Sequence, residues 1–459
     1  MPPNRGIMSG RAWSPGAAEP PHPSHAGSPP ATSSLLRAAF YLTALYVFLF
    51  ASRLPEFMGI RLRPMVVLAV ALLGAALLSG RLLAVLETRS GWLVVIFMGW
   101  LAFVTPFSRW RGGSAQVVIA FLKTLLVLVI MTALVQSVRD SLRLSYTVGF
   151  AMGAAALMGI LVGTEAGGRL EVDVAGGTLA DPNFFCLYIL TGLPLLWLQA
   201  KHASWIGKIL PLNLGLLILW SALRTASRSG LIAFVAGMLF LFWHIAPRQK
   251  MKFLVVGAVV GAVLLIAAPQ AALQRLTTWF ELDEIPSAQT EEEQTSARVA
   301  VESAESRRYL FWQSVLITLK NPLVGVGPGM FMEAEAEKSG LEGHRGAWHG
   351  THNMYTQVSS ETGIPGLVLF LWLLGSVYHC LTRTRKLAAA GGGPQHQLVR
   401  DAALYLQVAL VIVLVDGLFL NITFGGPLYI LAGLALGLEA AVRREWAGLP
   451  VPAGKVVRE

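Results

Sequence analysis

Long apolar runs alternate with short polar connectors along almost the whole chain. Several runs are shorter than the about 20 residues of a full membrane span, so the helices must extend into their flanks. This pattern predicts an all-α polytopic membrane protein with about 12 transmembrane helices and one large, partly helical loop. The apolar runs lie near 38–52, 64–78, 92–105, 115–135, 144–163, 184–200, 209–223, 231–246, 253–268, 363–381, 403–420 and 427–441.

The composition agrees with a membrane protein. Hydrophobic residues make up 54% and charged residues 14% of the chain, whereas soluble domains carry about 25% charged residues. The two cysteines, Cys186 and Cys380, cannot form a disulfide framework. The net charge of +10 would suggest nucleic acid in a soluble protein. Here we expect membrane lipids and no nucleic acid, and the charge instead decides which side of the membrane each connector occupies.

Basic residues mark one alternate set of connectors, which we therefore assign to the cytoplasm together with both termini. The opposite set contains the long segment 269–362, which is then extracytoplasmic, and periplasmic in a Gram-negative cell. Its acidic stretch 282–306 is expected to face solvent and to be helical in part. The basic set comprises Arg81, Arg89, Arg139, Arg143, Lys201, Lys208, Arg248, Lys250, Lys252, Arg383, Arg385, Lys386, Arg443 and Arg444.

Five segments follow from this topology. Residues 1–34 are rich in Pro, Ser, Gly and Ala and lack the apolar core of a signal peptide, so they predict a disordered cytoplasmic tail; an over-long translation start is the alternative. The remaining segments are expected to be transmembrane helices 1–9 at 35–268, a periplasmic loop with the catalytic motifs at 269–362, transmembrane helices 10–12 at 363–441 and a cytoplasmic tail at 442–459.

The outer connectors also carry arginines, which the positive-inside rule disfavours. One interpretation is that these side chains snorkel to the interface. The other is that several converge on an anion presented at the outer leaflet. The residues concerned are Arg53, Arg61, Arg63, Arg109, Arg111, Arg169, Arg224, Arg228, Arg307 and Arg308.

Two short outer motifs begin helices. In Ala180–Phe185, Asp181 and Pro182 suit an N-cap and a first helical turn, and a substrate contact by Asp181 or Asn183 is the alternative. In the Ser-Arg-Ser-Gly turn, Arg228 lies at the membrane edge, where it needs a carboxylate or a phosphate partner. A structural salt bridge and phosphate binding both remain open for it.

Two further motifs lie in the long loop. Residues 306–312 predict an amphipathic helix that places Trp312 one turn after Arg308, and the glycines of 321–329 form a loop able to approach a ligand closely. This loop lacks the features of a nucleotide-binding loop. His349 and His352 are three residues apart, but the chain offers no HExxH and no carboxylate at ligand spacing, so we expect no metal.

His352 is instead a candidate general base, because the ordinary pKa of histidine, about 6.5, lies near working pH. A capping or interfacial histidine is the alternative. Lys123 lies inside an apolar run, where a lysine is a functional candidate by default, and pairing with Asp416 or snorkelling competes with that.

Taken in order, these motifs resemble the O-antigen ligase/polymerase family of bacterial surface-polysaccharide enzymes. The resemblance rests on Asp-Pro-Asn-Phe-Phe, Ser-Arg-Ser-Gly, Arg-x-x-x-Trp with Asn-Pro-Leu-x-Gly-x-Gly-x-Gly, and His-Asn-x-Tyr with Glu-Thr-Gly, and it covers roughly 175–370. It implies a metal-independent glycosyltransferase without a cofactor, acting on glycans linked to undecaprenyl diphosphate at the outer face of the bacterial inner membrane. Carried over by motif, His352 is the essential histidine, and Arg228 and Arg308 bind the diphosphate.

The register between Arg307 and Arg308 stays open, and Lys123 is a further diphosphate-binding candidate. Other candidates are Asp181, Asn183, Asn353, Tyr355 and Glu361. We expect an O-antigen ligase that transfers the glycan, with inversion, to a hydroxyl of lipid A–core oligosaccharide in lipopolysaccharide biosynthesis. A polymerase or a protein O-oligosaccharyltransferase is the alternative, and a transporter of the lipid-linked glycan is disfavoured because no internal repeat is evident.

Overall fold

The computed structural model describes most of the chain between residues 31 and 446. The described residues are 31–59, 63–166, 168–172, 179–269, 273, 291–340 and 350–446, and the side chains of 31–35, 63 and 291–305 lie outside the description. The predicted tails at 1–34 and 442–459 therefore fall largely outside it, although a helix already begins at Ala31 and the last one ends at Trp446.

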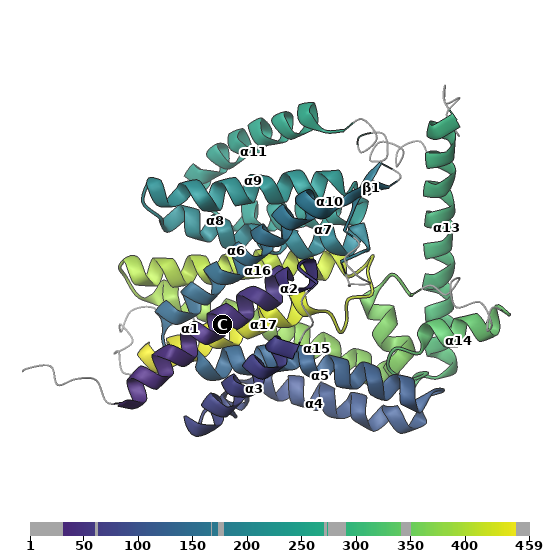
Figure 1. Cartoon of the computed structure of the whole chain (residues 1–459), viewed down its shortest axis with the longest axis horizontal. Helices are drawn as coiled ribbons and strands as arrows, with labels where there is room; N and C mark the ends of the chain where they lie inside the picture. Colours follow the sequence, from purple (N-terminus) through teal and green to yellow (C-terminus); the bar gives the residue numbers. More distant parts are fainter. Residues whose placement is uncertain are drawn as a thin grey trace, which may run out of the picture.

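Helices run roughly parallel along the long axis of the molecule and form one bundle (Figure 1). Its main helices are α1 (Ala31–Ser52), α3 (Arg63–Leu78), α4 (Arg89–Val104), α5 (Arg111–Leu134), α6 (Val138–Val162), α7 (Pro182–Leu190), α8 (Leu193–His202), α9 (Ile209–Arg224), α10 (Arg228–His244), α11 (Pro247–Ala267), α15 (Met354–Ala390), α16 (Pro394–Asp416) and α17 (Gly426–Trp446). Short elements link them: α2 (Leu54–Phe57), η1 (Ala84–Glu87), η2 (Thr105–Phe107) and η3 (Ile206–Lys208).

Nine helices within the described residues are long and apolar enough to cross a membrane. Three shorter apolar helices, Leu36–Ser52, Pro64–Leu78 and Arg228–His244, occupy the other three predicted runs. The fold is therefore that of a polytopic helical membrane protein, while the count of 12 spans stays a prediction. The all-α expectation needs one addition, an antiparallel hairpin of β1 (Thr164–Ala166) and β2 (Arg169–Glu171).

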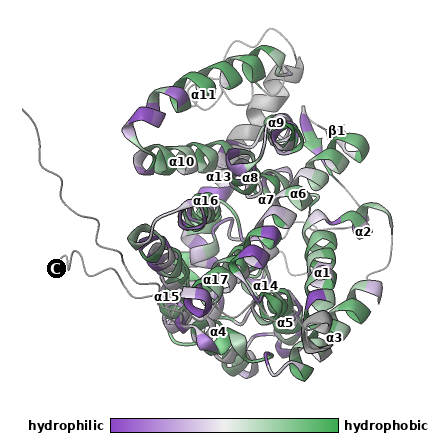
Figure 2. Cartoon of the chain, turned by 90° about the vertical axis from the view of Figure 1, so that its left-hand side faces the viewer, coloured by the Kyte–Doolittle hydropathy of each residue, from purple (hydrophilic) through white to green (hydrophobic). Residues whose placement is uncertain are grey.

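The helices differ sharply in how far the bundle surrounds them. In α17, 94% of the apolar window is buried, whereas none of that of α11 is. Figures 1 and 2 show α11 lying apart from the main bundle, beyond α9 and α10. Hydrophobic residues colour much of the helices in Figure 2, and many large apolar side chains are exposed. An outward apolar surface is expected for helices bathed in lipid, since lipid tails exert no hydrophobic drive to bury it.

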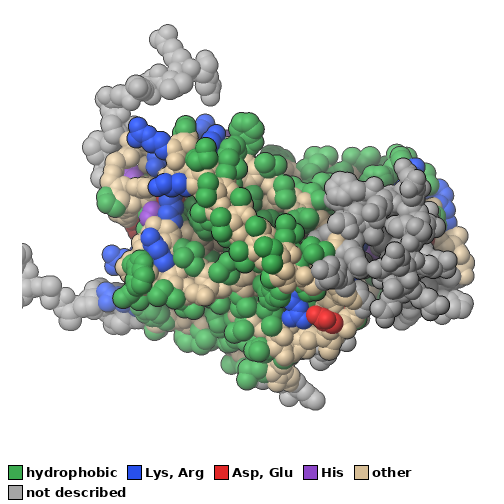
Figure 3. All heavy atoms as spheres, turned by 90° about the horizontal axis from the view of Figure 1, so that it is seen from above, with side chains coloured by type: hydrophobic (Ala, Val, Ile, Leu, Met, Phe, Trp, Pro, Cys, Tyr) green, Lys and Arg blue, Asp and Glu red, His purple; other side chains and the backbone are tan. Residues whose placement is uncertain are grey.

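The two ends of the bundle have different chemistry. One end gathers the terminus of α5, the start of α6 and the terminus of α17, because Arg444 donates to the carbonyl of Val135 at 2.9 Å and Glu445 accepts the N–H of Val138 at 2.8 Å. Lys and Arg side chains collect at the left-hand end of the molecule in Figure 3, beside a band of hydrophobic side chains. The opposite end in Figure 1 carries the hairpin, α2, α13 (Glu291–Lys320) and α14 (Phe331–Lys338).

The segment 269–362, predicted as a partly helical loop, contains α13, α14 and the first turns of α15. Its described residues are mostly helical, and residues 270–272, 274–290 and 341–349 are not among them. The helix expected to begin near residue 363 starts earlier, at Met354, and breaks at Gly363, where φ is 75° and Pro365 follows. Glycine allows this positive φ, so the break separates a short outer segment from the apolar part of α15.

Candidate functional site

The start of α7 forms one wall of the site. Asp181 is its N-cap, accepting the N–H of Asn183 at 2.8 Å, and Pro182 occupies the first turn, as the sequence predicted. Asn183 is buried, and its Oδ1 accepts a hydrogen bond from Nη2 of Arg169 at 2.8 Å. Asn183 thus contacts an arginine directly.

Arg169 lies on β2. The resemblance to the O-antigen ligase/polymerase family assigned roles to Arg228 and Arg308 but none to Arg169. Its Nε also donates to the carbonyl of Thr225, at 2.9 Å, in the turn before α10. Burial lowers its pKa below the usual range for arginine, Asp181 opposes that shift, and the positive charge of Arg307 adds to it. In the sequence Arg169 was only one of ten outer arginines, and no signal marks it apart from its place in a short outer connector.

Arg228 begins α10, and its position is fixed by the Ser-Arg-Ser-Gly turn. Ser227 caps the helix, because its Oγ accepts the N–H of Gly230 at 3.2 Å. Arg228 is partly buried, and the charge of Arg307 acts on it as well. Arg307 therefore interacts electrostatically with both Arg169 and Arg228, which lie on two other elements.

The register of the Arg-x-x-x-Trp motif favours Arg307. The side chain of Arg307 is partly buried and acts electrostatically on Arg169, Arg228 and Asp416, whereas Arg308 is exposed. Adjacent residues of a helix point about 100° apart, so only one of the two can face the cluster. The motif comparison placed the role on Arg308 and left this register open.

Asp416, at the end of α16, is a buried acid on which the charge of Arg307 acts. Its side chain is fully buried, and neither carboxyl oxygen has a hydrogen bond of ordinary geometry among the described residues. Ser229 faces it, and the charges of Asp181 and Arg307 act on it. Its expected partner Lys123 lies elsewhere: Lys123 is exposed on α5, which carries none of the three arginines. The name arginine cluster is used below for five residues: Arg169, Arg228, Arg307, Asp181 and Asp416.

His352 lies just before α15, and the two residues that follow it bond the segment at the end of α16. Met354 N–H donates to the carbonyl of Gly417 at 2.7 Å, and Asn353 Nδ2 donates to that of Leu418 at 3.0 Å. His352 itself is partly buried and has a φ of 48°, in the left-handed region that few non-glycine residues adopt. These bonds hold the His352 segment at the helix end that carries Asp416.

Two other candidates from the same block have structural contacts. Asn353 is the N-cap of α15, accepting the N–H groups of Tyr355 and Thr356 at 2.9 and 3.0 Å. The hydroxyl of Tyr355 donates to the carbonyl of Leu414 at 2.8 Å and so joins α15 to α16. His349 lies outside the described residues.

The glycine-rich loop packs against protein, which corrects the expectation that its glycines approach a ligand. Gly325, Gly327 and Gly329 all have positive φ, and a Cβ on Gly327 would collide with Ser108 Oγ. The carboxylate of Glu361, which is buried, accepts the N–H of Gly329 at 2.8 Å. The glycines and Glu361 thus fasten the loop between α5 and α15.

Other outer arginines pair within the protein. Arg53 binds Glu56, Arg109 binds Glu337, and Arg224 binds Glu165. Arg53 and Glu56 are three residues apart, so their pairing is local in the sequence. The other two pairs join residues far apart in the chain, and the sequence alone does not indicate them. Arg61 and the side chain of Arg63 lie outside the described residues. Among those described, no group of three His, Cys, Asp or Glu side chains is arranged to hold a metal ion.

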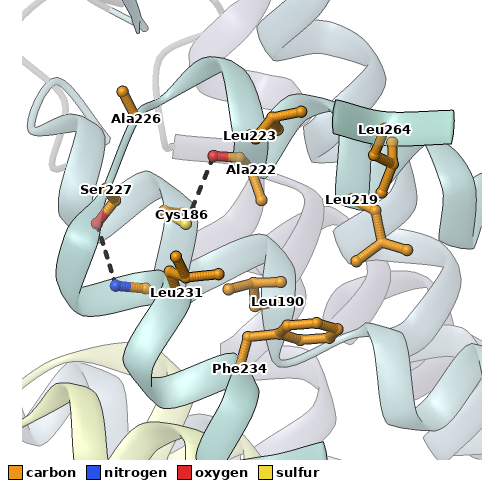
Figure 4. A pocket seen from close by; sticks show the side chains of 11 residues that line it. Cys186, Leu190, Leu219, Ala222, Leu223, Ala226, Ser227, Leu231, Phe234 and Leu264 are labelled. Atoms are coloured by element: carbon orange, nitrogen blue, oxygen red, sulfur yellow. Dashed lines mark hydrogen bonds between the residues drawn. The ribbon is translucent and has the colours of Figure 1, made fainter. Parts of the chain in front are cut away.

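An apolar cavity of about 110 Å³ lies directly beside the Ser227 turn (Figure 4). It is bounded by α7, α9, α10 and α11, and Ser227 and Cys186 are the polar side chains in a lining that is otherwise aliphatic or aromatic. The lining residues are Cys186, Leu190, Leu219, Ala222, Leu223, Ala226, Ser227, Gly230, Leu231, Phe234 and Leu264. An apolar space therefore adjoins the residue that precedes Arg228.

The fold and this site define a multi-pass membrane protein with a cationic cluster at one end of its bundle. Residues 214–371, about a third of the chain, match the model of the O-antigen ligase family. The resemblance seen in the motifs is confirmed over this segment, which contains the Ser-Arg-Ser-Gly turn, α13, the glycine loop and the His-Asn block. A comparison with curated proteins gave no match. The family indicates a glycosyltransferase-like enzyme of ligase or polymerase type that uses a lipid-linked glycan donor and an acceptor.

Proposed function

We propose that the protein is an O-antigen ligase that moves a glycan from undecaprenyl diphosphate to a hydroxyl of lipid A–core oligosaccharide. The observation that carries this proposal is that Arg169, from β2, bonds the carbonyl of Thr225 in the turn that leads to Arg228, and that the charge of Arg307, from α13, acts on both arginines. Three like charges repel one another, so their proximity favours binding of a multiply charged anion. A lipid diphosphate has that charge, and the apolar cavity beside Ser227 suits the first isoprene units of its tail.

The proposed reaction is a single displacement. The acceptor oxygen attacks the anomeric carbon, the bond from that carbon to the diphosphate oxygen breaks, and the hydroxyl proton passes to His352. Guanidinium groups bind phosphate oxygens in bidentate fashion and stabilise the charge that develops on the leaving diphosphate. One displacement inverts the anomeric centre. A product that retains the donor's anomeric configuration would contradict this mechanism.

We place the cluster at the periplasmic face of the bacterial inner membrane. Support comes from the basic residues at the opposite end of the bundle, which the positive-inside rule assigns to the cytoplasm. Lys123 is left out of the proposed site, because its side chain is exposed on α5, which carries no member of the arginine cluster. Asp416 is proposed to offset part of the positive charge of the cluster, through its electrostatic interaction with Arg307, while the diphosphate is absent.

The decisive experiment is complementation of a ligase-deficient strain, read as the lipopolysaccharide ladder on a gel. A ligase restores the ladder of long-chain lipopolysaccharide. A polymerase instead changes the length distribution of the chains in a polymerase-deficient strain, and a protein oligosaccharyltransferase glycosylates a protein. Restoration of the ladder by Arg228→Ala would remove the cluster from the proposed chemistry, provided that immunoblotting shows the variant in the membrane.

A further inference from the structure

The C-terminal half of α13 has a buried face and an exposed face, and the exposed face is unexpectedly apolar. Leu310, Ser314 and Ile317 are buried towards the rest of the protein. The opposite face would be polar on a helix exposed to water, but here it is apolar. Its exposed residues are Tyr309, Trp312, Leu316, Leu319 and, just past the helix, Leu323. Their spacing of three and four residues aligns them in one stripe along the helix. This set is called the α13 stripe below.

The stripe joins a surface that already faces lipid. Ile364 N–H donates to the carbonyl of Pro322 at 2.7 Å, which places the end of the stripe beside the kink of α15. From Ile364, exposed apolar side chains continue at helical spacing through Val368 and Trp372 on a helix apolar enough to span the membrane. The stripe and the lipid-facing side of α15 therefore meet at this point.

The orientation and charge of α13 agree with a position at the membrane surface. Figure 1 shows α13 crossing the end of the bundle, whereas the spanning helices run along it. Trp312 and Tyr309 are residue types that prefer the head-group region, and the exposed Arg308 and Lys320 flank the stripe. Helices with an apolar face and flanking cations bind the interface of anionic bilayers.

We propose that the α13 stripe docks on the lipid head-group surface beside the arginine cluster, with Arg308 and Lys320 contacting anionic head groups. This contact fixes Arg307, on the other side of the same helix, at the depth of lipid phosphates. The inference rests on exposure, spacing and continuity with α15, and it holds whichever glycan the protein transfers. A second copy of the chain is the competing occupant of the stripe.

Depth measurements on the full-length protein in liposomes test the proposal. A fluorophore on Leu316→Cys reports on the stripe, Val368→Cys on the lipid-facing surface of α15, and Gly392→Cys on an exposed connector with open space around it. Native Cys186 and Cys380 are buried, and the unsubstituted protein measures their background labelling. Each label is quenched in turn by iodide in water and by lipids that carry a nitroxide near the head group.

The expected result is that the Leu316→Cys label resembles the Val368→Cys label, with strong quenching by the nitroxide lipid and loss of quenching by iodide. The Gly392→Cys label should show the reverse. Joint charge reversal by Arg308→Glu and Lys320→Glu should restore iodide quenching at position 316 in vesicles containing phosphatidylglycerol, and change it less in pure phosphatidylcholine. Iodide quenching of position 316 equal to that of position 392 would overturn the proposal. So would protection that persists in detergent together with crosslinking of two copies through position 316, which would assign the stripe to a dimer.

Discussion

Nη2 of Arg169 donates to Oδ1 of Asn183 at 2.8 Å and so joins the β1–β2 hairpin to the first turn of α7. The same asparagine also donates from Nδ2 to Asp181 at 3.0 Å. The amide thus links a carboxylate to a guanidinium, and it orients the arginine while the capping acid stays in place. Under the proposed function, this contact directs one of the three cations at the lipid diphosphate.

Asn183→Ala should weaken donor binding more than it slows the chemical step. A hydrogen bond to a charged group contributes about 1.5–3 kcal/mol, so KM for the donor should rise by about tenfold or more, with a smaller change in kcat. A transfer assay in membranes with varied donor concentration measures the split. Asn213→Ala is the matched control, because Asn213 is exposed on α9 and bonds only its own helix. An unchanged donor KM would show that Arg169 does not need this contact.

Arg307 and Arg308 should differ strongly although they are neighbours. Arg307 acts on Arg169 and Arg228, whereas Arg308 is exposed. Arg307→Ala should therefore lower transfer by about 10²-fold or more, as removal of one charge-stabilising donor does in other enzymes. Arg308→Ala should retain most activity at saturating donor. The two variants serve as controls for each other in one membrane assay. Equal losses would contradict the assignment of the two side chains to different faces of α13.

His352→Asn is the sharpest test of the proposed base. Asparagine tolerates the left-handed φ of 48° better than most residues, so the variant removes the imidazole with little added backbone strain. Loss of general-base catalysis should lower kcat by about 10²- to 10⁴-fold, with the protein still present in the membrane. His244→Asn, an exposed histidine at the end of α10, is the control. Wild-type transfer by His352→Asn would exclude His352 as the base.

Gly327→Ala should destabilise the fold, because the glycine loop is a packing element. A methyl group there meets Ser108 and Ser114 at a φ of 109°, whereas Gly340, at a φ of 71°, has open space around it. Gly340→Ala therefore measures backbone strain alone, about 1–2 kcal/mol. Thermal unfolding in detergent should show a clearly larger loss for Gly327→Ala. Similar melting temperatures for the two variants would mean that the loop is free to move away from α5.

Hydropathy identified the runs in which the described residues form nine helices long and apolar enough to span a membrane and three shorter apolar helices. It could do so because a helix satisfies its backbone hydrogen bonds within its own segment. Local chemistry likewise identified the Asp181 cap and the helix that carries Arg307 and Trp312. Both depend on residues only a few positions apart in the chain.

The tertiary structure decided which outer arginines act together. Arg169, Arg228 and Arg307 look the same in sequence as Arg53, Arg109 and Arg224, which pair with nearby carboxylates. Only packing brings β2, α10, α13 and the end of α16 to one place, and only it turns Glu361 and the glycines towards the protein interior. Such contacts join residues far apart in the chain, and their geometry is fixed by the mutual packing of helices, which no local pattern of residues encodes.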